Sequence, residues 1–467
     1  MAMSDLVEKL RSELGDVGVL TGADAEEKAQ GGWSHLGTPL AVVRPASTEE
    51  TSKALKLCHA AGQGIVAWGG KTGLVEGGNA EGMIALSMER MHKIEEIDTV
   101  SGTMTVQAGT VLEAACDAVE AKGFFFPLDL GARGSATIGG NVSTNAGGNR
   151  VLRYGMMREM VLGLEVVLAD GTVLSSMNSM LKNNAGYDLK QLFIGTEGTL
   201  GVVTRAVVRL RPAPSSQDVA FVGVGEFDAM PRLLRHMDIA LGGTLSAFEV
   251  MWEDFYNLVT REPALGKPPL ASTHPYYVLV ESLGGHQEED SARFEAALMA
   301  AMEEGIISDA VIAKNQSERD AMWALRDDVG QVAQNWPIFT YDVSLGISHM
   351  EKYVATVKER LAAEWDSPTA MIFGHLGDGN LHVIVGVGDG EPEARRRVEE
   401  IVYSPLREIG GSVSAEHGIG LEKRPYLGWS RTPEEVALMH TLKATLDPKG
   451  ILNPGKVLEP GLRAAAE

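Results

Sequence analysis

Cysteine is scarce in this sequence, with only Cys58 and Cys116 among 467 residues. Two cysteines cannot build a disulfide framework, and their scarcity favours a reducing compartment. No apolar run approaches the roughly 18 residues that a membrane-spanning helix needs. The segment Met1–Lys9 carries acidic residues and lacks the apolar core of a signal peptide. We therefore predict a cytoplasmic protein without a membrane span, beginning with a short exposed helix.

Basic residues are also few: 41 Lys and Arg stand against 63 Asp and Glu, a formal net charge of −22. An acidic surface disfavours nucleic acid and anionic membranes as partners. It does not exclude an anionic small molecule, because one Arg or a metal ion can reverse the local field. The hydrophobic content of 44% is that of a soluble globular protein, and the length predicts two or three domains.

Two familiar nucleotide-binding patterns are missing. A phosphate loop ending in Gly-Lys-Thr would need glycine where Ile65 stands, and no strand is followed by Gly-x-Gly-x-x-Gly. Glycine is nevertheless dense in Gly69–Gly73, directly after the predicted strand Ile65–Trp68. Glycines in such a loop let backbone N–H groups approach an anion closely.

A second glycine-rich stretch, Pro127–Gly148, mixes glycine with Ser, Thr and Asn and has few acids. A loop of this length without structure of its own is uncommon unless it is functional. We interpret it as wrapping a long polar cofactor that contains a pyrophosphate. The alternative is an ordinary connector.

Two histidines, His375 and His382, stand seven residues apart among glycines, and the pair Glu416-His417 follows roughly thirty residues later. Zn²⁺ and similar ions take imidazole nitrogen and carboxylate oxygen ligands. A set of two His and one carboxylate leaves coordination positions open, which predicts a catalytic metal site. The alternative is that both histidines are structural residues near a hairpin.

Nine motifs together resemble a known family. Four of them are similar to the FAD-binding domain of the vanillyl-alcohol-oxidase/p-cresol-methylhydroxylase superfamily. Five are similar to its FAD-linked D-2-hydroxyacid dehydrogenase branch. The resemblance covers about residues 36 to 458. In chain order the motifs are Gly69–Leu74, Ser135–Asn141, Asn145–Gly148, Gly195–Gly201, Trp323–Arg326, Tyr341–Ser344, Gly374–His382, Ala415–Gly420 and Leu452–Lys456.

The resemblance implies an α+β, two-domain flavoprotein. Its FAD-binding domain has two α/β subdomains, its substrate domain is an antiparallel sheet with helices, and a C-terminal segment returns to the FAD domain. We expect the active site between the domains. The predicted divisions are 1–35 (helical segment), 36–213 (FAD domain), 214–421 (substrate domain with the metal site) and 422–467 (helical segment on the FAD domain).

The resemblance also implies non-covalent FAD, with the pyrophosphate against the amides of Gly70–Leu74 and Thr137–Gly140. The predicted cofactor-binding residues are Gly69, Gly70, Lys71, Thr72, Gly73, Leu74, Pro127, Ser135, Thr137, Gly139, Gly140, Ser143, Asn145, Gly148, Glu197, Val203 and Asn453.

The implied reaction oxidises a D-2-hydroxy acid to the 2-oxo acid. His375, His382 and Glu416 match the metal ligands, with Zn²⁺ the favoured ion. His417 matches the general base, and Arg326 matches the residue that grips the substrate carboxylate. The other predicted substrate-binding residues are Thr340, Ile384 and Asn380.

Three departures from the 2-hydroxyglutarate branch bear on the substrate. That branch has Lys, Asn and Thr where this sequence has Thr340, Ile384 and Gly330. A pocket without these groups would leave a distal carboxylate unpaired. We therefore predict a short or apolar tail, as in D-lactate; D-2-hydroxyglutarate and glycolate are the alternatives.

Two other classes of function remain open from the sequence: a metal-dependent hydrolase, and a non-catalytic flavin-binding subunit. For a dehydrogenase, the electron acceptor would be an electron-transfer flavoprotein, a cytochrome or a quinone. We also expect a homodimer.

Overall fold

The computed structural model describes residues 3–264 and 266–460. The chain folds into two compact units. The first unit comprises residues 1–148, 155–213 and 416–467, and the second comprises 149–154 and 214–415. Met1, Ala2 and residues 461–467 of the predicted terminal segments lie outside the described residues. Within the described ranges, no helix is long and apolar enough to cross a membrane.

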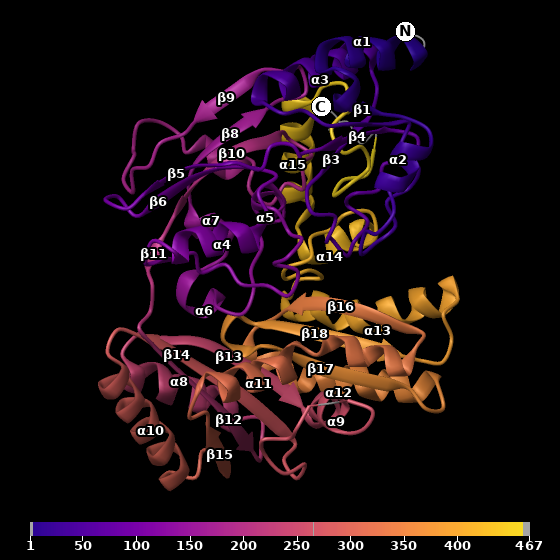
Figure 1. Cartoon of the computed structure of the whole chain (residues 1–467). Coiled ribbons are helices and arrows are strands. Elements are labelled where there is room, and N and C mark those ends of the chain that lie inside the picture. The colour runs from indigo at the N-terminus through magenta and orange to yellow at the C-terminus, as the bar shows by residue number, and fades with distance from the viewer. Residues whose placement is uncertain (1–2, 265, 461–467) are drawn as a thin grey trace. The chain divides into compact units, whose positions relative to one another are not determined.

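The first sheet of the first unit has four strands in the order β1-β2-β4-β3, of which Figure 1 labels β1, β3 and β4. β4 is parallel to both β2 and β3, so the chain crosses over between these strands. The crossover from β2 to β3 contains α3. Ser47 accepts a hydrogen bond from the Glu50 N–H and starts α3, and Gly62, in the left-handed conformation, ends it. The bounds are β1 (Val19–Leu20), α2 (Ala23–Lys28), β2 (Ala41–Val43), α3 (Thr48–Ala61), β3 (Ile65–Trp68) and β4 (Ile84–Ser87).

The second sheet of the first unit is antiparallel, in the order β5-β6-β10-β8-β9. β8 and β9 form a hairpin that turns at Asp170-Gly171. A two-stranded pair, β7-β11, joins Phe124–Phe125 to Arg211–Pro212. The remaining bounds are β5 (Ile94–Asp98), β6 (Thr103–Gln107), α4 (Leu112–Glu120), α5 (Ile138–Thr144), α7 (Met157–Met160), β8 (Val161–Val167), β9 (Val173–Ser176) and β10 (Val202–Arg209).

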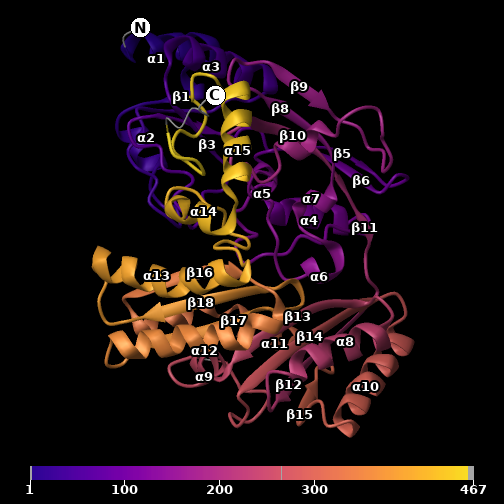
Figure 2. The ribbon, with the colours of Figure 1, turned by 180° about the vertical axis from the view of Figure 1, so that it is seen from behind.

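The C-terminal segment belongs to the first unit. The Ile65 N–H donates to the Ile451 carbonyl and the Asn453 N–H donates to the Ile65 carbonyl, each at 2.8 Å. These bonds place Ile451–Asn453 along the edge of β3, and Figure 2 shows α15 beside the same strands. The helices of this segment are α14 (Leu427–Ser430) and α15 (Pro433–Leu446).

The first helix, α1 (Met3–Leu14), differs from its prediction as an exposed helix. Leu6 and Leu10 are 1% and 0% exposed, and Leu14 is also buried. Apolar residues at this spacing share one helix face, which packs against α3. The prediction was wrong because it weighed only the charged residues of the segment.

The second unit is built on a seven-stranded sheet in the order β15-β12-β14-β13-β17-β18-β16, with every neighbouring pair antiparallel. This is the antiparallel domain that the resemblance implies. The strands are β12 (Ser216–Val224), β13 (Leu245–Trp252), β14 (Tyr276–Gly284), β15 (Asp309–Ile312), β16 (Ile338–Ser344), β17 (Thr369–His375) and β18 (Asn380–Gly386).

The two faces of this sheet carry different helices. Phe255 of α9 and Leu325 of α11 pack with Phe373 and Ile384 in one apolar cluster. Tyr341 points to the opposite face, where its ring meets Tyr403 of α13. The helices of the unit are α6 (Val151–Tyr154), α8 (Ala229–Leu241), α9 (Glu253–Thr260), α10 (Gln287–Glu303), α11 (Gln316–Asp327), α12 (Ile347–Glu364) and α13 (Pro392–Ile409).

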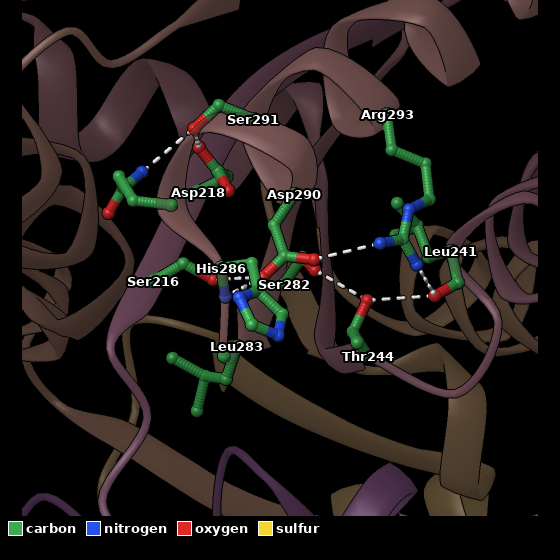
Figure 3. A network of polar contacts seen from close by, with 12 residues as sticks. Ser216, Asp218, Leu241, Thr244, Ser282, Leu283, His286, Asp290, Ser291 and Arg293 are labelled. Atoms are coloured by element: carbon green, nitrogen blue, oxygen red, sulfur yellow. Dashed lines mark hydrogen bonds and ion pairs between the residues drawn. The ribbon is translucent and has the colours of Figure 1, made fainter.

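Buried polar contacts fasten α10 to the sheet (Figure 3). The Asp290 carboxylate accepts hydrogen bonds from the Ser216 hydroxyl at 2.6 Å and from Arg293 at 2.9 Å. The next residue along α10, Ser291, donates to Asp218 at 2.6 Å. Asp290 on α10 and Asp218 on β12 thus each have a hydroxyl partner, which is what buried carboxylates require.

Candidate active site

In the first unit, the two predicted glycine regions lie against each other. A Cβ atom on Gly70 would stand 2.0 Å from the Ser135 carbonyl oxygen, and one on Gly69 would stand 2.5 Å from Oγ1 of Thr137. The neighbour of Gly70 is backbone, which cannot turn aside, so only glycine fits there, whereas at Gly69 the Thr137 side chain would have to move. The fold therefore brings Gly69–Leu74 and Ser135–Gly140 together, as the cofactor prediction requires.

The amides of these two regions differ in availability. The N–H groups of Ile138 and Gly139 donate to the carbonyls of Thr110 and Ala108, at 2.9 and 2.7 Å. Among the described residues, no backbone N–H from Gly70 to Leu74 donates to another protein group. The predicted amide cradle is therefore only half available, and the first loop is the part that can bind an anion.

Several other predicted cofactor-binding side chains are engaged within the first unit. The Lys71 ammonium bonds to the Lys28 carbonyl at 2.8 Å, and burial lowers its pKa. Asn145 accepts from the Arg158 N–H at 2.9 Å. Ser143 donates to the Gly139 carbonyl. Val203 is buried in β10, paired with Val166 of β8.

Glu197 and Asn453 hold the C-terminal segment onto the first unit. The Glu197 carboxylate accepts from the N–H groups of Ile419 and Gly420, at 2.7 and 2.9 Å. Burial raises the pKa of Glu197, against the opposing effect of these two amides. Asn453 accepts from the Ala67 N–H at 3.0 Å and donates to the Glu197 carbonyl at 2.6 Å. Both side chains therefore shape the turn that follows His417.

In the second unit, a buried ionic cluster surrounds His375. Glu249 of β13 stands opposite His375 of β17 in the sheet register. Its carboxylate lies 2.7 Å from Nδ1 of His375 and accepts from Nε of Arg326 at 2.8 Å. Burial alone would raise the pKa of Glu249, but His375 and Arg326 together lower it, so the carboxylate is ionised.

Arg326 reaches this cluster from α11. Asn315 caps the helix, and Met322 lies on the same buried face one turn before Arg326. Nη2 of Arg326 lies 3.2 Å from Nε2 of His375. The predicted substrate-gripping residue thus also contacts a predicted metal ligand.

His382 is the next member of the same sheet face. Its ring centroid lies 5.4 Å from that of His375, and the two histidines offer nitrogen atoms within 4.8 Å of each other. Asp342 stands opposite His382 in the register and accepts from Nδ2 of Asn380 at 3.1 Å. Oδ1 of Asn380 is buried and has no partner among the described residues, so this predicted substrate-binding residue retains an acceptor.

The chain passes from the second unit to the first between Ala415 and Glu416. On one side, the Ser414 hydroxyl donates to Asp342 at 3.2 Å. On the other, Glu416 accepts from the Gly148 N–H at 2.7 Å. Gly148 has φ +120°, and a Cβ there would meet the Asp129 carbonyl at 1.9 Å. A predicted cofactor residue and a predicted metal ligand are therefore in contact within the first unit.

Two of the three positions that depart from the 2-hydroxyglutarate branch are neighbours. Thr340 and Ile384 face each other across β16 and β18. Ile384 is 2% exposed and belongs to the apolar cluster, whereas Thr340 is exposed.

Sequence reasoning missed Glu249. A single acid inside the apolar strand Leu245–Trp252 was the available signal, because a buried charge needs a partner. The same signal marks Glu281 in β14, which pairs with Arg150 at 2.9 Å.

Comparisons with known proteins agree with this architecture. Residues 213–457 match the family described as FAD linked oxidases, C-terminal domain, and residues 39–176 match the FAD binding domain. The chain is similar in fold to p-cresol methylhydroxylase, with a TM-score of 0.78 at 18% identity over 98% of this chain and 97% of that one.

Three curated relatives cover most of the sequence. The chain is 42% identical to D-2-hydroxyglutarate dehydrogenase, mitochondrial, from Bos taurus, over 90% of this chain and 77% of the relative. It is 38% identical to D-2-hydroxyglutarate dehydrogenase from Xanthomonas citri pv. viticola, over 91% of each. It is also 38% identical to a Schizosaccharomyces pombe protein named as a candidate mitochondrial D-lactate dehydrogenase, over 90% and 82%.

These comparisons correct one prediction and decide another. The cytoplasmic localisation is wrong, because relatives such as the Bos taurus and Schizosaccharomyces pombe proteins are named as mitochondrial. The acidic N-terminal segment was weak evidence for a compartment. The function is that of an oxidoreductase, so the metal-dependent hydrolase is set aside. The chain belongs to the FAD-linked D-2-hydroxyacid dehydrogenase family, and it shares the fold of p-cresol methylhydroxylase.

Proposed function

We propose that this protein oxidises a D-2-hydroxy acid with a short or apolar tail to the 2-oxo acid, using non-covalent FAD and a divalent metal ion. The observation that best supports a metal ion is the contact between the Glu249 carboxylate and Nδ1 of His375, at 2.7 Å. Histidines that bind metals usually donate their other ring N–H to a carboxylate or carbonyl. The residues present therefore fit a metal ion on Nε2 of His375, in place of the Arg326 N–H that lies 3.2 Å from this nitrogen.

His375, His382 and Glu416 are the proposed metal ligands. Ser414 is held on Asp342, and Glu416 follows two residues later, which limits its Cα to within about 7 Å of the Ser414 Cα. Nitrogen and carboxylate ligands make Zn²⁺ the first choice of ion. When bound, the metal ion supplies a positive charge that lowers the pKa of the substrate hydroxyl.

FAD is supported by the loop Gly70–Leu74, whose amides make no protein hydrogen bond among the described residues. This loop and the close approach of Gly70 to Ser135 form a backbone cradle that suits a pyrophosphate. When bound, FAD supplies the hydride acceptor, which no side chain can provide. The chain's own residues then have to bind and orient the substrate and move one proton.

His417 is the proposed general base. It directly follows the proposed ligand Glu416, which would bring a base close to the substrate hydroxyl that must lose a proton. A neutral imidazole accepts a proton near pH 7. Arg326 would pair with the substrate carboxylate through its planar fork, and its bond to Glu249 fixes the plane of that fork. Such pairing orients the Cα–H bond for transfer.

The apolar surroundings of Ile384 support a substrate with a short or apolar tail. Ile384 lies on the same face of β18 as His382 and packs with Met371 and Phe373. A carboxylate placed against this cluster would lose its hydration without gaining a partner. We therefore favour D-lactate and D-2-hydroxybutyrate.

D-2-hydroxyglutarate is the second candidate, because the Bos taurus and Xanthomonas relatives carry that name. The two candidates separate in kcat/KM. We expect D-lactate or D-2-hydroxybutyrate to exceed D-2-hydroxyglutarate. A tenfold preference for D-2-hydroxyglutarate over both would overturn the apolar-tail proposal.

The test is an anaerobic flavin-bleaching assay on the purified full-length protein. D- and L-2-hydroxy acids are scanned before and after treatment with a chelator, and the chelated sample is then given Zn²⁺ or Mn²⁺. We expect one D-acid to bleach the flavin, and we expect bleaching to stop on chelation and return with metal. Bleaching that survives complete metal removal would refute the metal role. A yellow protein that no acid bleaches would favour the non-catalytic flavin subunit.

Two further proposals concern the electron acceptor and the oligomeric state. A protein with a formal net charge of −22 could pass its electrons to an electron-transfer flavoprotein or a cytochrome. A quinone acceptor and a homodimer are further candidates.

A further inference from the structure

Glu249 contacts both a proposed metal ligand and the proposed substrate-gripping residue. It is 1% exposed and lies in the middle of an otherwise apolar part of β13. One carboxylate oxygen, Oε1, lies 2.7 Å from Nδ1 of His375, and the other, Oε2, accepts from Nε of Arg326 at 2.8 Å. Both oxygens are therefore used.

These contacts determine which ring nitrogen of His375 carries the proton. Glu249 is ion-paired with Arg326, and a carboxylate in such a pair accepts hydrogen bonds, so Nδ1 of His375, 2.7 Å away, donates to it. Nη2 of Arg326 lies 3.2 Å from Nε2, and a guanidinium only donates, so Nε2 accepts. Both neighbours thus favour the tautomer that carries its lone pair on Nε2, where a metal ion would take the place of the Arg326 N–H.

We propose that Glu249 is a positioning residue that presents the Nε2 lone pair of His375 to the metal and fixes the guanidinium of Arg326 beside it. This inference rests on the proposed function, because it takes His375 as a metal ligand. One side chain then couples the metal site to the substrate carboxylate site. Without Glu249, the imidazole ring can flip or change its tautomer. The metal ion can then meet a protonated nitrogen in place of the Nε2 lone pair.

A merely structural ion pair is the competing explanation, and the chain contains a matched example. Glu281 of β14 lies on the same sheet face, is 0% exposed and pairs with Arg150 at 2.9 and 3.1 Å. Its other side-chain partners among the described residues are neutral Ser, Gln and Trp donors, and none is a histidine. Glu249 and Glu281 thus share burial and an arginine partner and differ in the contact with His375.

The experiment compares Glu249→Gln with Glu281→Gln in the full-length, FAD-loaded protein. The proteins are stripped of metal, and the Zn²⁺ dissociation constant is measured by competition with a chromophoric chelator. We expect Glu249→Gln to weaken Zn²⁺ binding by about 10- to 100-fold, the usual effect of losing such a carboxylate. We expect Glu281→Gln to change the Zn²⁺ dissociation constant by less than about threefold, even if its melting temperature falls as much as that of Glu249→Gln.

Two further measurements keep the outcome decisive. Glu249→Asp keeps the charge but withdraws it by one methylene, so it should weaken Zn²⁺ binding to an intermediate degree. It replaces the glutamine variant if that variant does not fold. The absorption spectrum of the Co²⁺-loaded protein should change in the Glu249 variants and not in Glu281→Gln.

Two results would overturn the inference while leaving the proposed function intact. One is a Zn²⁺ affinity and Co²⁺ spectrum of the Glu249 variants equal to those of the wild type. The other is an equal loss of affinity in Glu281→Gln. If the wild-type protein itself binds neither ion, the metal part of the proposed function fails, and this inference fails with it.

Discussion

The two units prepare their sites in opposite ways. In the first unit, the candidate site is built from glycine-rich backbone: Gly70 and Gly148 lie so close to carbonyl oxygens that no Cβ would fit. In the second unit, the candidate site is built from charged side chains: Glu249, Arg326 and His375 are buried together on one face of a sheet. A backbone site is sensitive to an added methyl group, whereas a side-chain site is sensitive to a lost charge.

This difference follows from the secondary structure available to each unit. Loops between short parallel strands and helices leave N–H groups without carbonyl partners, and these groups suit a large anionic cofactor. A long antiparallel sheet uses all its own N–H groups in the ladder, so its chemistry must come from the side chains that alternate along each strand.

The largest effect is expected from removing a side chain of the second unit. His382→Ala should abolish stoichiometric metal binding and lower kcat by about 10²- to 10⁴-fold, because a metal supplies several kcal/mol of charge stabilisation. Metal content and steady-state kinetics check this. His349→Ala, on the exposed side of α12, is the control and should behave as wild type. Full metal content in His382→Ala would remove this histidine from the site.

In the first unit, the corresponding test adds a methyl group. Gly70→Ala would bring a Cβ to 2.0 Å from the Ser135 carbonyl oxygen, whereas a Cβ on the exposed Gly428 of the same unit meets nothing within 4 Å. We expect Gly70→Ala to lose most of its FAD and about 1–3 kcal/mol of stability, and Gly428→Ala to lose little of either. The flavin-to-protein absorbance ratio and thermal melting measure both. Equal flavin content in the two variants would contradict the backbone cradle.

A smaller effect is expected at Asn453, the side chain that joins β3 to the Glu197 turn. Replacing it by Ala leaves the Ala67 N–H and the Glu197 carbonyl without their partner, at a cost of about 1–3 kcal/mol. Its φ is +41°, so Asn453→Gly should be less destabilised than Asn453→Ala. Urea unfolding of both variants decides this, and a glycine variant less stable than the alanine variant would refute the account.

The smallest effect is a pH dependence from Lys456, a buried cation in the first unit. Its ammonium bonds to the Asn79 carbonyl, and burial lowers its pKa to about 8, despite the opposing charge of Glu76. An unfolded lysine titrates near 10.4. Between these values the unfolded chain binds the proton and the folded chain does not, so the contribution of Lys456 to stability rises with pH.

The measurement for Lys456 is thermal melting of wild type and Lys456→Met at pH 7.5 and 9.5. The melting temperature of the wild type should gain on that of Lys456→Met as the pH rises. Lys122→Met, at an exposed position, should show no such change relative to wild type. A pH-independent difference between wild type and Lys456→Met would mean that the folded protein keeps this lysine charged.

Local pattern predicted many elements of the fold. The strand Ile65–Trp68 forms where it was predicted. Hydrophobic spacing and turn residues also account for the helix that ends at Gly62 and for the hairpin at Asp170-Gly171. The exposed helix at the N-terminus was wrong, because whether Leu6 and Leu10 are covered depends on α3, more than 30 residues away. The predicted amide cradle was only partly available, because Thr110 and Ala108 take the amides of α5.

The glycine loops, the spacing of His375 and His382 and the family of these motifs can be recognised without the fold. The groups that support these motifs depend on how the chain folds. Glu249 lies 126 residues from His375, and Asn453 lies 386 residues from Ala67. Such pairs arise from the register of neighbouring strands and from the return of the C-terminal segment to the first unit. The local pattern of the sequence does not indicate them. Motifs can be read from the sequence because neighbouring residues build them, whereas positioning residues become visible only after folding.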